Sequence, residues 1–375
     1  MSVSTYDVVI AGAGIVGAAC AFECARRGLR VAVIERDVVG SGATAAGMGH
    51  IVVMDDSEAQ FALTRLSQQL WRELAPQLPA DVEYDACGTI WIAADEDELG
   101  ELSRKHAFYR ARGVPTEIIG AAELARLEPN LRPGLAGGLL VFEDAVLYPP
   151  CAARFLVEQA QQHGAVLYSG SVCEIGRGRA RLKDSTEFSA RWIVNALGAS
   201  SPALTPGIDV RKRKGHLVIT DRYPGFARHQ LVELGYLKRA HSLTSDSVAF
   251  NIQPRRTGQM LIGSSRQYGA EGCEVESVML SRMLKHAQQY MPALAGLSAI
   301  RAWTGFRPAT SDKLPLIGPW PEEESVFLAT GHEGLGITTS LGTAHLLVSQ
   351  LTGERAAIPF EPYLPSRVLL EPVHD

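Results

Sequence analysis

The sequence has little net charge and no basic excess. Its 375 residues include 36 Lys and Arg against 41 Asp and Glu, a net charge of −5 with histidine neutral. Proteins that bind nucleic acid or anionic membranes concentrate positive charge, so we expect neither partner. The one dense basic run, from Arg211 to Lys214, is predicted to be a solvated loop, with a docking surface for a partner protein as the alternative.

Cysteines are few, and their spacing suits no metal. Two of the six stand four residues apart within an expected helix, which is not the spacing of a chelating pair. No iron–sulfur ligand pattern is present either, so we expect no metal site. Free cysteines in a chain of this length favour a reducing compartment. The six are Cys20, Cys24, Cys87, Cys151, Cys173 and Cys273.

Long apolar runs are missing as well. No stretch reaches the roughly 18 residues that a membrane span needs, and the first residues, MSVSTYDVVIAGAG, lack the basic start of a signal peptide. We therefore expect a cytoplasmic protein that does not span a membrane. Hydrophobic residues make up 46% and charged residues 21% of the chain. Such a composition is typical of a soluble protein with one large domain or two intertwined ones.

The hydrophobic pattern predicts two regions of different secondary structure, one with alternating strands and helices and one with strands alone. Strands are expected at 8–10, 31–34, 87–94, 165–168 and 191–195, and helices up to about residue 27 and at 58–74, 95–112 and 151–163. From 215 to about 265, β-rich runs follow one another without helices, which favours an antiparallel sheet. A helix at 275–290, a strand at 326–328 and a helix at 337–351 complete the pattern. The expected fold class is α/β, a Rossmann-like nucleotide domain with a mixed, largely antiparallel second domain.

The glycines near the N-terminus predict a dinucleotide site. Gly12, Gly14 and Gly17 have GxGxxG spacing directly after a strand and at the start of a helix. They allow a tight turn, close approach of a pyrophosphate and close packing of helix on strand, while the helix N-terminus attracts phosphate. Glu35, at the end of the second strand, is placed to accept hydrogen bonds from a ribose. FAD and NAD share this motif, so it does not choose between them.

Four stretches together resemble the family of FAD enzymes that includes D-amino-acid oxidase, glycine oxidase and D-amino-acid dehydrogenase. After the glycine motif come GSGATAAGMGH (40–50), RWIVNALGA (191–199) and the pair GFRPATSDKLPLIGP and ATGHEGLGITTSLGTAHLL, which ends at 347. The resemblance implies FAD, held non-covalently, and a fold of the GR2 or DAO type. It divides the chain into an FAD-binding domain (1–82, 145–214 and 300–375) and a substrate-binding domain (83–144 and 215–299).

The resemblance also implies which residues contact FAD. A physical reason supports part of this assignment. The helix expected after Gly331, Gly334 and Gly336 would present the positive end of its dipole, the N-terminus, to the flavin. The expected cofactor residues are Gly12, Gly14, Ile15, Val16, Gly17, Glu35, Arg36, Ser41, Gly42, Ala43, Thr44, Ala46, Gly47, Met48, Val172, Ala196, Gly198, Gly331, His332, Gly334, Leu335, Gly336, Ile337 and Thr338.

Arg307 is the expected substrate anchor. Pro308 restrains its backbone, so the arginine is predicted to lie in a stiff extended segment. In the family the arginine of this Arg–Pro motif binds the carboxylate of an amino acid, and a planar fork suits that task. The alternative is a structural ion pair with Asp312.

Two positions depart from the glycine-oxidase pattern. A second arginine and a tyrosine of that pattern correspond here to Gly334 and Asn251, which implies a different amine. Asn251 therefore joins the expected catalytic residues. So does His50, which either faces the flavin or substrate or is a hydrogen-bonded structural histidine. His332 is expected to contribute backbone and not a catalytic side chain.

GATAAGMGHIVVMDD and KGHLVITDRYPG are most similar to the flavin subunits of bacterial D-hydroxyproline dehydrogenases. That resemblance implies oxidation of cis-4-hydroxy-D-proline to an imine, by hydride transfer from Cα to flavin N5. It also implies a hetero-oligomer whose companion subunits carry iron–sulfur or other electron-transfer sites. The alternatives are an oxygen-using oxidase of glycine, sarcosine or another D-amino acid, an NAD-dependent dehydrogenase, and a non-catalytic flavin-binding subunit.

Overall fold

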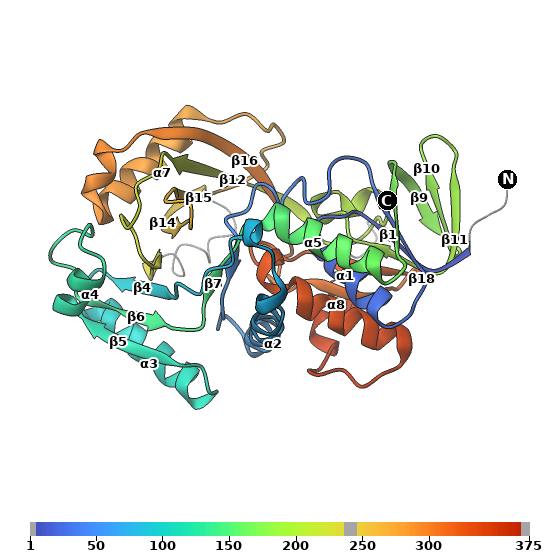
Figure 1. Cartoon of the computed structure of the whole chain (residues 1–375), viewed down its shortest axis with the longest axis horizontal. Coiled ribbons are helices and arrows are strands. Elements are labelled where there is room, and N and C mark those ends of the chain that lie inside the picture. The colour runs from blue at the N-terminus through green and yellow to red at the C-terminus, as the bar shows by residue number, and fades with distance from the viewer. Residues whose placement is uncertain (1–4, 236–245, 369–375) are drawn as a thin grey trace, which may run out of the picture.

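The computed structural model describes residues 5–235 and 246–368, and its chain is built around two large sheets (Figure 1). The first has the order β17-β18-β11-β1-β2-β8, with β9 and β10 attached through β11. Its central pairs are parallel, and β17 joins antiparallel to β18. The strands are β1 (Thr5–Ala11), β2 (Val31–Glu35), β8 (Val166–Ser169), β9 (Val172–Gly176), β10 (Arg179–Leu182), β11 (Glu187–Asn195), β17 (Leu316–Trp320) and β18 (Glu323–Thr330).

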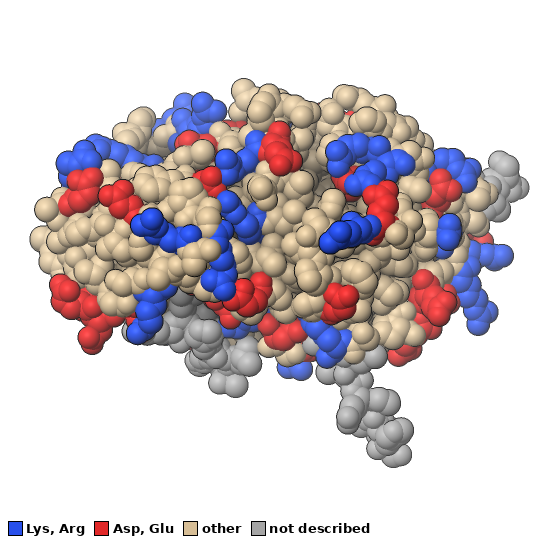
Figure 2. All heavy atoms as spheres, turned by 90° about the horizontal axis from the view of Figure 1, so that it is seen from below, with Lys and Arg blue, Asp and Glu red and all other residues tan. Residues whose placement is uncertain are grey.

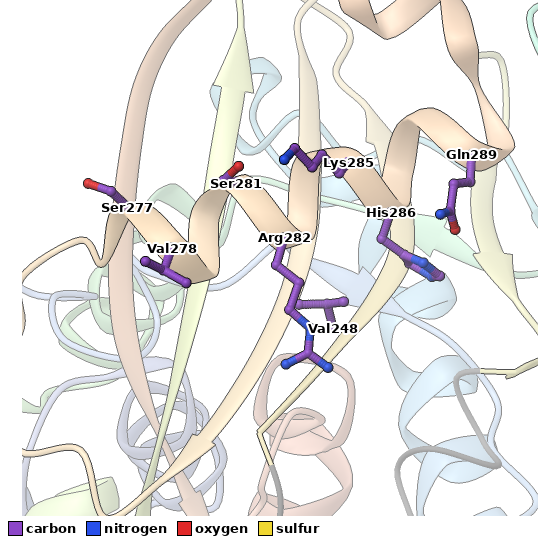
Figure 3. A pocket seen from close by; sticks show the side chains of 8 residues that line it. All are labelled: Val248, Ser277, Val278, Ser281, Arg282, Lys285, His286 and Gln289. Atoms are coloured by element: carbon purple, nitrogen blue, oxygen red, sulfur yellow. The ribbon is translucent and has the colours of Figure 1, made fainter.

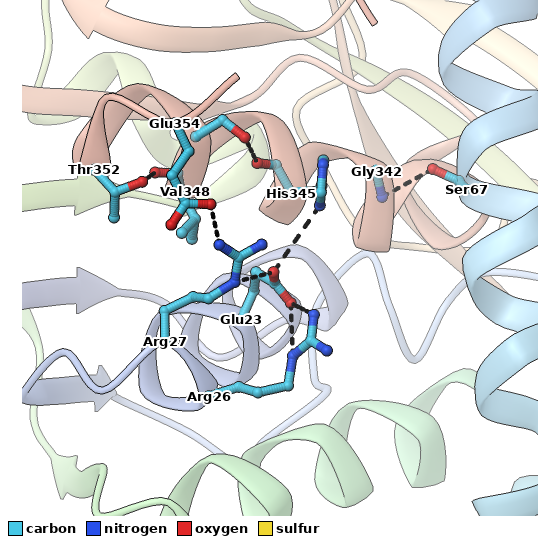
Figure 4. A network of polar contacts seen from close by, with 10 residues as sticks. Glu23, Arg26, Arg27, Ser67, Gly342, His345, Val348, Thr352 and Glu354 are labelled. Carbon is cyan, nitrogen blue, oxygen red and sulfur yellow. Dashed lines mark hydrogen bonds and ion pairs between the residues drawn. The ribbon is translucent and has the colours of Figure 1, made fainter. Parts of the chain in front are cut away.

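Three helices pack together beside the first sheet and bury its main core. They are α1 (Ile15–Arg26), α5 (Pro149–Gln162) and α8 (Gly336–Thr352), with α2 (Glu58–Leu74) against α8. Figure 4 shows the polar contacts that link α1, α2 and α8. Buried Glu23 pairs with Arg26 and Arg27, Arg27 reaches Glu354, and the Ser67 hydroxyl accepts from the Gly342 amide at 3.0 Å.

The second sheet has eight strands in the order β16-β12-β15-β14-β13-β4-β6-β5. All its neighbours are antiparallel except the pair of β13 with β4. The strands are β4 (Thr89–Ala93), β5 (Thr116–Gly120), β6 (Gly137–Val141), β12 (Arg211–Thr220), β13 (Gln230–Glu233), β14 (Ser247–Pro254), β15 (Met260–Tyr268) and β16 (Ala299–Ala309).

Helix α7 (Ser277–Tyr290) covers one face of this second sheet, where Met279 and Met283 pack on Phe250 and Ile252. The remaining elements within residues 5–235 and 246–368 are α3 (Glu96–Ala111), α4 (Ala121–Leu127), the small sheet of β3 (His50–Ile51) with β7 (Ala145–Val146), and six 3-10 turns. The turns are η1 (Ala75–Gln77), η2 (Ala80–Val82), η3 (Gly198–Ala203), η4 (Pro292–Gly296), η5 (Glu361–Tyr363) and η6 (Pro365–Val368).

The sequence-based elements are confirmed in type, with ends shifted by a few residues, and the α/β class with an antiparallel second sheet is confirmed. The strands β3, β5, β6, β7, β9, β10 and β17 and the helix α4 were not predicted. No described helix is both long and apolar enough to cross a membrane. Figure 2 shows acidic and basic side chains interspersed over the face that it presents.

The prediction for the basic run was wrong. Residues 211–214 begin β12, an interior strand of the second sheet, and Arg213 and Lys214 are 1% and 2% exposed. Each buried cation has an acidic partner, Glu333 for Arg213 and Glu276 for Lys214. These partners are distant in sequence, so the local charge pattern gave no sign of burial.

Candidate functional site

The glycine motif forms a turn that side chains cannot enter. Gly12 has φ +101°, and a Cβ there would lie 2.8 Å from the Ala196 carbonyl oxygen. A Cβ on Gly17 would lie 1.9 Å from the Gly12 oxygen. Gly14 stands at the N-cap of α1, and the Glu35 carboxylate accepts from the Ala13 amide at 2.7 Å. Strand end, turn, helix N-terminus and acid are thus arranged as a dinucleotide cradle requires.

The segment from Gly40 to Met48 runs from this cradle to the second sheet. Ser41, Gly42 and Ala43 lie in its turns, and the Thr44 hydroxyl accepts from the Ile15 amide at 3.0 Å.

The end of this segment, Ala46 to Met48, lies directly on the second sheet. A Cβ on Gly305 of β16 would be 2.3 Å from the Ala46 Cβ, and one on Gly47 would be 2.7 Å from Cδ1 of Ile337. Met48 packs with Leu217 of β12. The segment is therefore held between the start of α8 and the second sheet.

Other expected cofactor residues line the first sheet. Ala196 donates its amide to the Ala11 oxygen at 3.0 Å, and the Gly198 oxygen accepts from Thr330 at 3.0 Å. Val172 begins β9 and packs beside the core that contains Ile34. Arg36 is exposed and pairs with Asp37, whose amide bonds to Glu35.

The segment from Gly331 to Thr338 joins both sheets. Gly331 has φ +79°, Leu335 precedes α8, and Gly336 is the first residue of that helix. The Thr338 hydroxyl donates to the His50 carbonyl oxygen at 2.7 Å, which fixes α8 against β3. Glu333 has φ 52°, donates its amide to the Pro308 oxygen at 2.7 Å and pairs with Arg213 of β12. The turn carrying Gly334 is thereby fixed beside Arg307.

His332 is buried in this segment and makes a hydrogen bond at 2.9 Å between Nε2 and the Thr343 hydroxyl. Burial lowers its pKa to about 3. The imidazole is therefore neutral at ordinary pH.

Arg307 lies in β16, as the predicted extended segment required. Its guanidinium crosses β12 at Gly215, where a Cβ would be 2.2 Å from Nη1, and Nη1 donates to the Ser265 oxygen of β15 at 3.0 Å. The Asp312 carboxylate, the predicted partner in the ion-pair alternative, pairs with Arg367 through two nitrogens at 2.7 and 3.2 Å.

His50 is the centre of a polar cluster. Its Nδ1 lies 2.6 Å from Oε1 of Gln230, and its Nε2 lies 3.4 Å from Nδ2 of Asn251. Gln253 approaches Nδ1 at 3.3 Å. Burial, and to a lesser degree the charge of Arg307, lowers the pKa of His50 to about 4 despite the bond to Gln230. The structure thus brings His50 and Asn251 into contact and places Arg307 close enough to act on the histidine.

Gln230 and Gln253 were not predicted. They stand on β13 and β14, in the runs HQLVEL and SVAFNIQP. A polar residue at every second position of an otherwise apolar strand indicates a face that does not enter the core. Asn251 and Gln253 follow that spacing, so the pattern was readable once the strand was known.

Arg307 and Asn251 lie on one face of the second sheet, together with residues that were not predicted. Residues 303, 305 and 307 of β16, 215 and 217 of β12, and 251 and 253 of β14 contact one another, His50 or the Ala46–Met48 segment. The alternate residues face α7. Figure 3 shows a pocket on α7 lined by Val278, Arg282, Lys285 and His286. Because α7 covers the opposite face, this pocket is separate from the cluster.

A family model described as FAD dependent oxidoreductase, of the DAO family, matches residues 7–350. The chain belongs to this family. It is an FAD-dependent oxidoreductase and binds FAD, and the cradle at Gly12, Gly14 and Glu35 fits the dinucleotide part of that cofactor.

Relatives match over nearly the whole chain. The glycine oxidase of Geobacillus kaustophilus is 28% identical, over 96% of this chain and 96% of its own. The hydrogen cyanide synthase subunit HcnC of Pseudomonas aeruginosa is 27% identical, over 98% and 97%. The crystal structure of the G. kaustophilus glycine oxidase superposes with a TM-score of 0.87, covering 98% of this chain and 100% of that one. L-proline dehydrogenase from P. horikoshii, 22% identical with a TM-score of 0.87 over 98% of each chain, shares the fold.

We predict that Gly14→Val loses FAD. A side chain at this N-cap occupies the space through which the pyrophosphate approaches the backbone, and its Cβ would already lie 3.2 Å from the Thr44 hydroxyl. Gly120→Val is the matched control, because Gly120 caps α4 with ψ 174°, as Gly14 caps α1, and has open space around it. The flavin absorbance per folded chain should fall only in Gly14→Val; equal flavin content in both variants would contradict the placement.

The neutral state of His332 predicts a pH-dependent contribution to stability. The pKa of a histidine is ordinarily 6.5, whereas that of His332 in the folded protein is about 3. As the pH falls, His332 is therefore protonated in the unfolded chain before it is protonated in the folded protein. The contribution is full above about pH 6.5 and is lost below it by about 1.4 kcal/mol per pH unit. The free energy of unfolding of wild type minus that of His332→Asn, measured by denaturant with saturating FAD, should shrink from pH 7 to 5. A constant difference would mean that the pKa of His332 is not lowered in the folded protein.

Proposed function

We propose that this protein oxidises an amino or imino acid to an imine, with cis-4-hydroxy-D-proline as the favoured substrate. The observation that carries the proposal is the placement of the Arg307 guanidinium across Gly215, on the sheet face that also meets the Ala46–Met48 segment and the His50 cluster. Bound FAD supplies the acceptor for the hydride that leaves Cα, at its N5.

Arg307 is proposed to bind the substrate carboxylate. A planar guanidinium donates two parallel hydrogen bonds to a carboxylate, which fixes the substrate's orientation as well as its position. The orientation of the guanidinium is fixed, because it occupies the space that a side chain at Gly215 would fill and Nη1 donates to the Ser265 oxygen. His50 and Asn251 are proposed to contact the rest of the substrate, and no strong acid or base is required when the amine arrives unprotonated.

The cofactor residues named from the sequence are proposed to hold FAD non-covalently. Gly12 to Gly17, Glu35 and Arg36 serve the dinucleotide end, together with Val172, Ala196 and Gly198. Ser41 to Met48 and Gly331 to Thr338 serve the flavin end. The division into an FAD-binding part (1–82, 145–214, 300–375) and a substrate-binding part (83–144, 215–299) follows from the same proposal. The two sheets support it, although β12 and β16 cross the boundaries at 214 and 300.

Hydroxyproline is favoured over glycine by the side chains around Arg307. Position 334 is a glycine whose Cβ would lie 3.8 Å from the Arg307 Nε, so no second arginine stands there. The cluster offers neutral amides to a substrate with a polar group beyond its carboxylate. We further infer that the protein works in a hetero-oligomer with iron–sulfur or other electron-transfer subunits; one relative, HcnC, is by name a subunit.

Anaerobic reduction of the bound flavin tests the function. Purified protein is mixed without oxygen with D-proline, both hydroxyproline epimers, other D-amino acids, glycine and sarcosine, and bleaching of the flavin absorbance is followed. We expect cis-4-hydroxy-D-proline to bleach it fastest. Bleaching by glycine or sarcosine alone would replace hydroxyproline by a glycine-oxidase activity. No bleaching by any of them would favour a non-catalytic flavin subunit.

Arg307→Ala is predicted to keep FAD and lose substrate affinity. Removing one partner of a charge-assisted pair costs about 2–5 kcal/mol, or roughly 30-fold and upward in Kd. Arg307→Lys should recover only part of this, because an ammonium is a point charge. Arg301→Ala is the control on the same strand, since Arg301 is exposed and stacks on Trp303. Unchanged Kd for the acid in Arg307→Ala, from anaerobic stopped-flow, would remove the anchor and with it the amino-acid class.

A further inference from the structure

The polar cluster around His50 is a hydrogen-bonded chain with a defined direction. Nε2 of Gln230 donates to the Thr89 hydroxyl at 3.1 Å, so Oε1 of Gln230 is the atom that meets His50 Nδ1 at 2.6 Å. An amide oxygen only accepts. Nε2 of Gln253, a donor, stands 3.3 Å from the same Nδ1, but the contact with Gln230, at 2.6 Å, is the shorter one and decides the tautomer. His50 therefore carries its proton on Nδ1.

The direction continues to Asn251. With its proton on Nδ1 and its imidazole neutral, His50 offers a lone pair at Nε2, which accepts from Nδ2 of Asn251 at 3.4 Å. The amide of Asn251 is thereby oriented, and its other end, Oδ1, is an acceptor. Asn251 is 8% exposed, and among the described residues no group donates to this oxygen. A buried acceptor without a donor costs about 1–3 kcal/mol.

We propose that Asn251 Oδ1 accepts a hydrogen bond from a donor, N–H or O–H, that the substrate carries beside its carboxylate. This assignment rests on the proposed function, because Arg307 would hold the carboxylate on the same sheet face. We take the donor to be neutral, because the positive charge of Arg307, which acts on His50, disfavours a second cation beside it. The substrate class is therefore an amino or imino acid with a free N–H or a hydroxyl at this oxygen, and Gln230 and His50 are positioning residues for it.

Three cyclic acids show whether the donor is the substrate's amine or its hydroxyl. None of them has a hydrogen on a carbon that bears an amine, so they bind without being oxidised. Cyclopentanecarboxylate has no donor, cis-3-hydroxycyclopentanecarboxylate has a hydroxyl, and 1-aminocyclopentanecarboxylate has an amine but no Cα hydrogen. Binding to the FAD-loaded protein is measured by calorimetry below and above the pKa of the amino acid's amine, so that its charged and neutral forms are compared. One hydrogen bond of about 1 kcal/mol corresponds to a gain of about 5-fold in affinity. A gain for the hydroxy acid names the hydroxyl as the donor, and a gain for the amino acid names the amine.

The variant that decides is Asn251→Ala. We expect it to abolish the gain while leaving the affinity for cyclopentanecarboxylate unchanged. Asn130→Ala, which removes a partly buried asparagine bonded to the Phe226 oxygen at 2.8 Å, should keep the gain. A gain that survives in Asn251→Ala, or no gain in the wild type, overturns the proposal.

Gln230→Met tests the positioning role, because methionine fills the space without accepting from Nδ1. We expect ¹⁵N NMR of the histidines to show His50 redistributed between its two tautomers, and the gain to fall. An unchanged tautomer would overturn the relay. If none of the acids binds through Arg307, judged with Arg307→Ala, the proposed function itself fails. If they bind through Arg307 without a gain, only the role of Asn251 fails.

Discussion

The site depends on how closely the segment from Ala46 to Met48 lies on the second sheet. Any side chain at Gly305 would collide with Ala46, and one at Gly263 would lie 2.6 Å from Leu217 and 3.1 Å from the Met48 sulfur. A third glycine, Gly215, leaves its space to the Arg307 guanidinium. The strands β16, β15 and β12 thus each carry a glycine where a side chain would block the site. Because glycine weakens a strand, the eight-stranded sheet and its apolar packing on α7 must supply the rigidity.

A buried ion pair joins the same sheet to the glycine-rich segment before α8. Arg213 follows the register of β12 to lie opposite Arg307 on β16, and it pairs with Glu333. Losing either partner would leave a buried charge uncompensated, which is costly. The pair also stabilises the left-handed backbone of Glu333, which a non-glycine residue rarely adopts. The turn at Gly334 and the guanidinium of Arg307 are therefore fixed by one shared set of contacts.

Features that depend on residues close in sequence were predicted, and features that depend on residues remote in sequence were missed. The turn at Gly12, the helix that follows and the extended backbone of Arg307 are set by neighbours in sequence, and each was predicted. The burial of Arg213 and Lys214 depends on Glu333 and Glu276, which are remote in sequence, so a charge run was mistaken for a loop. Gln230 and Gln253 belong to no motif. Their meeting at His50 follows from the strand order of the second sheet, which no local pattern contains.

The position of Asn251 depends in turn on an irregularity in strand pairing. Val248 pairs with Ser265 and Asn251 with Gly263, so two residues of β14 stand opposite one of β15 between them. Such a bulge re-aims the side chains that follow it. In an unbroken ladder Asn251 would lie opposite Ile262, whose side chain packs in the core under α7. Because side chains alternate between faces, a slip of one residue would turn the asparagine away from His50 and bring an apolar neighbour in its place. The bulge therefore decides whether β14 presents an amide or a hydrocarbon to the site.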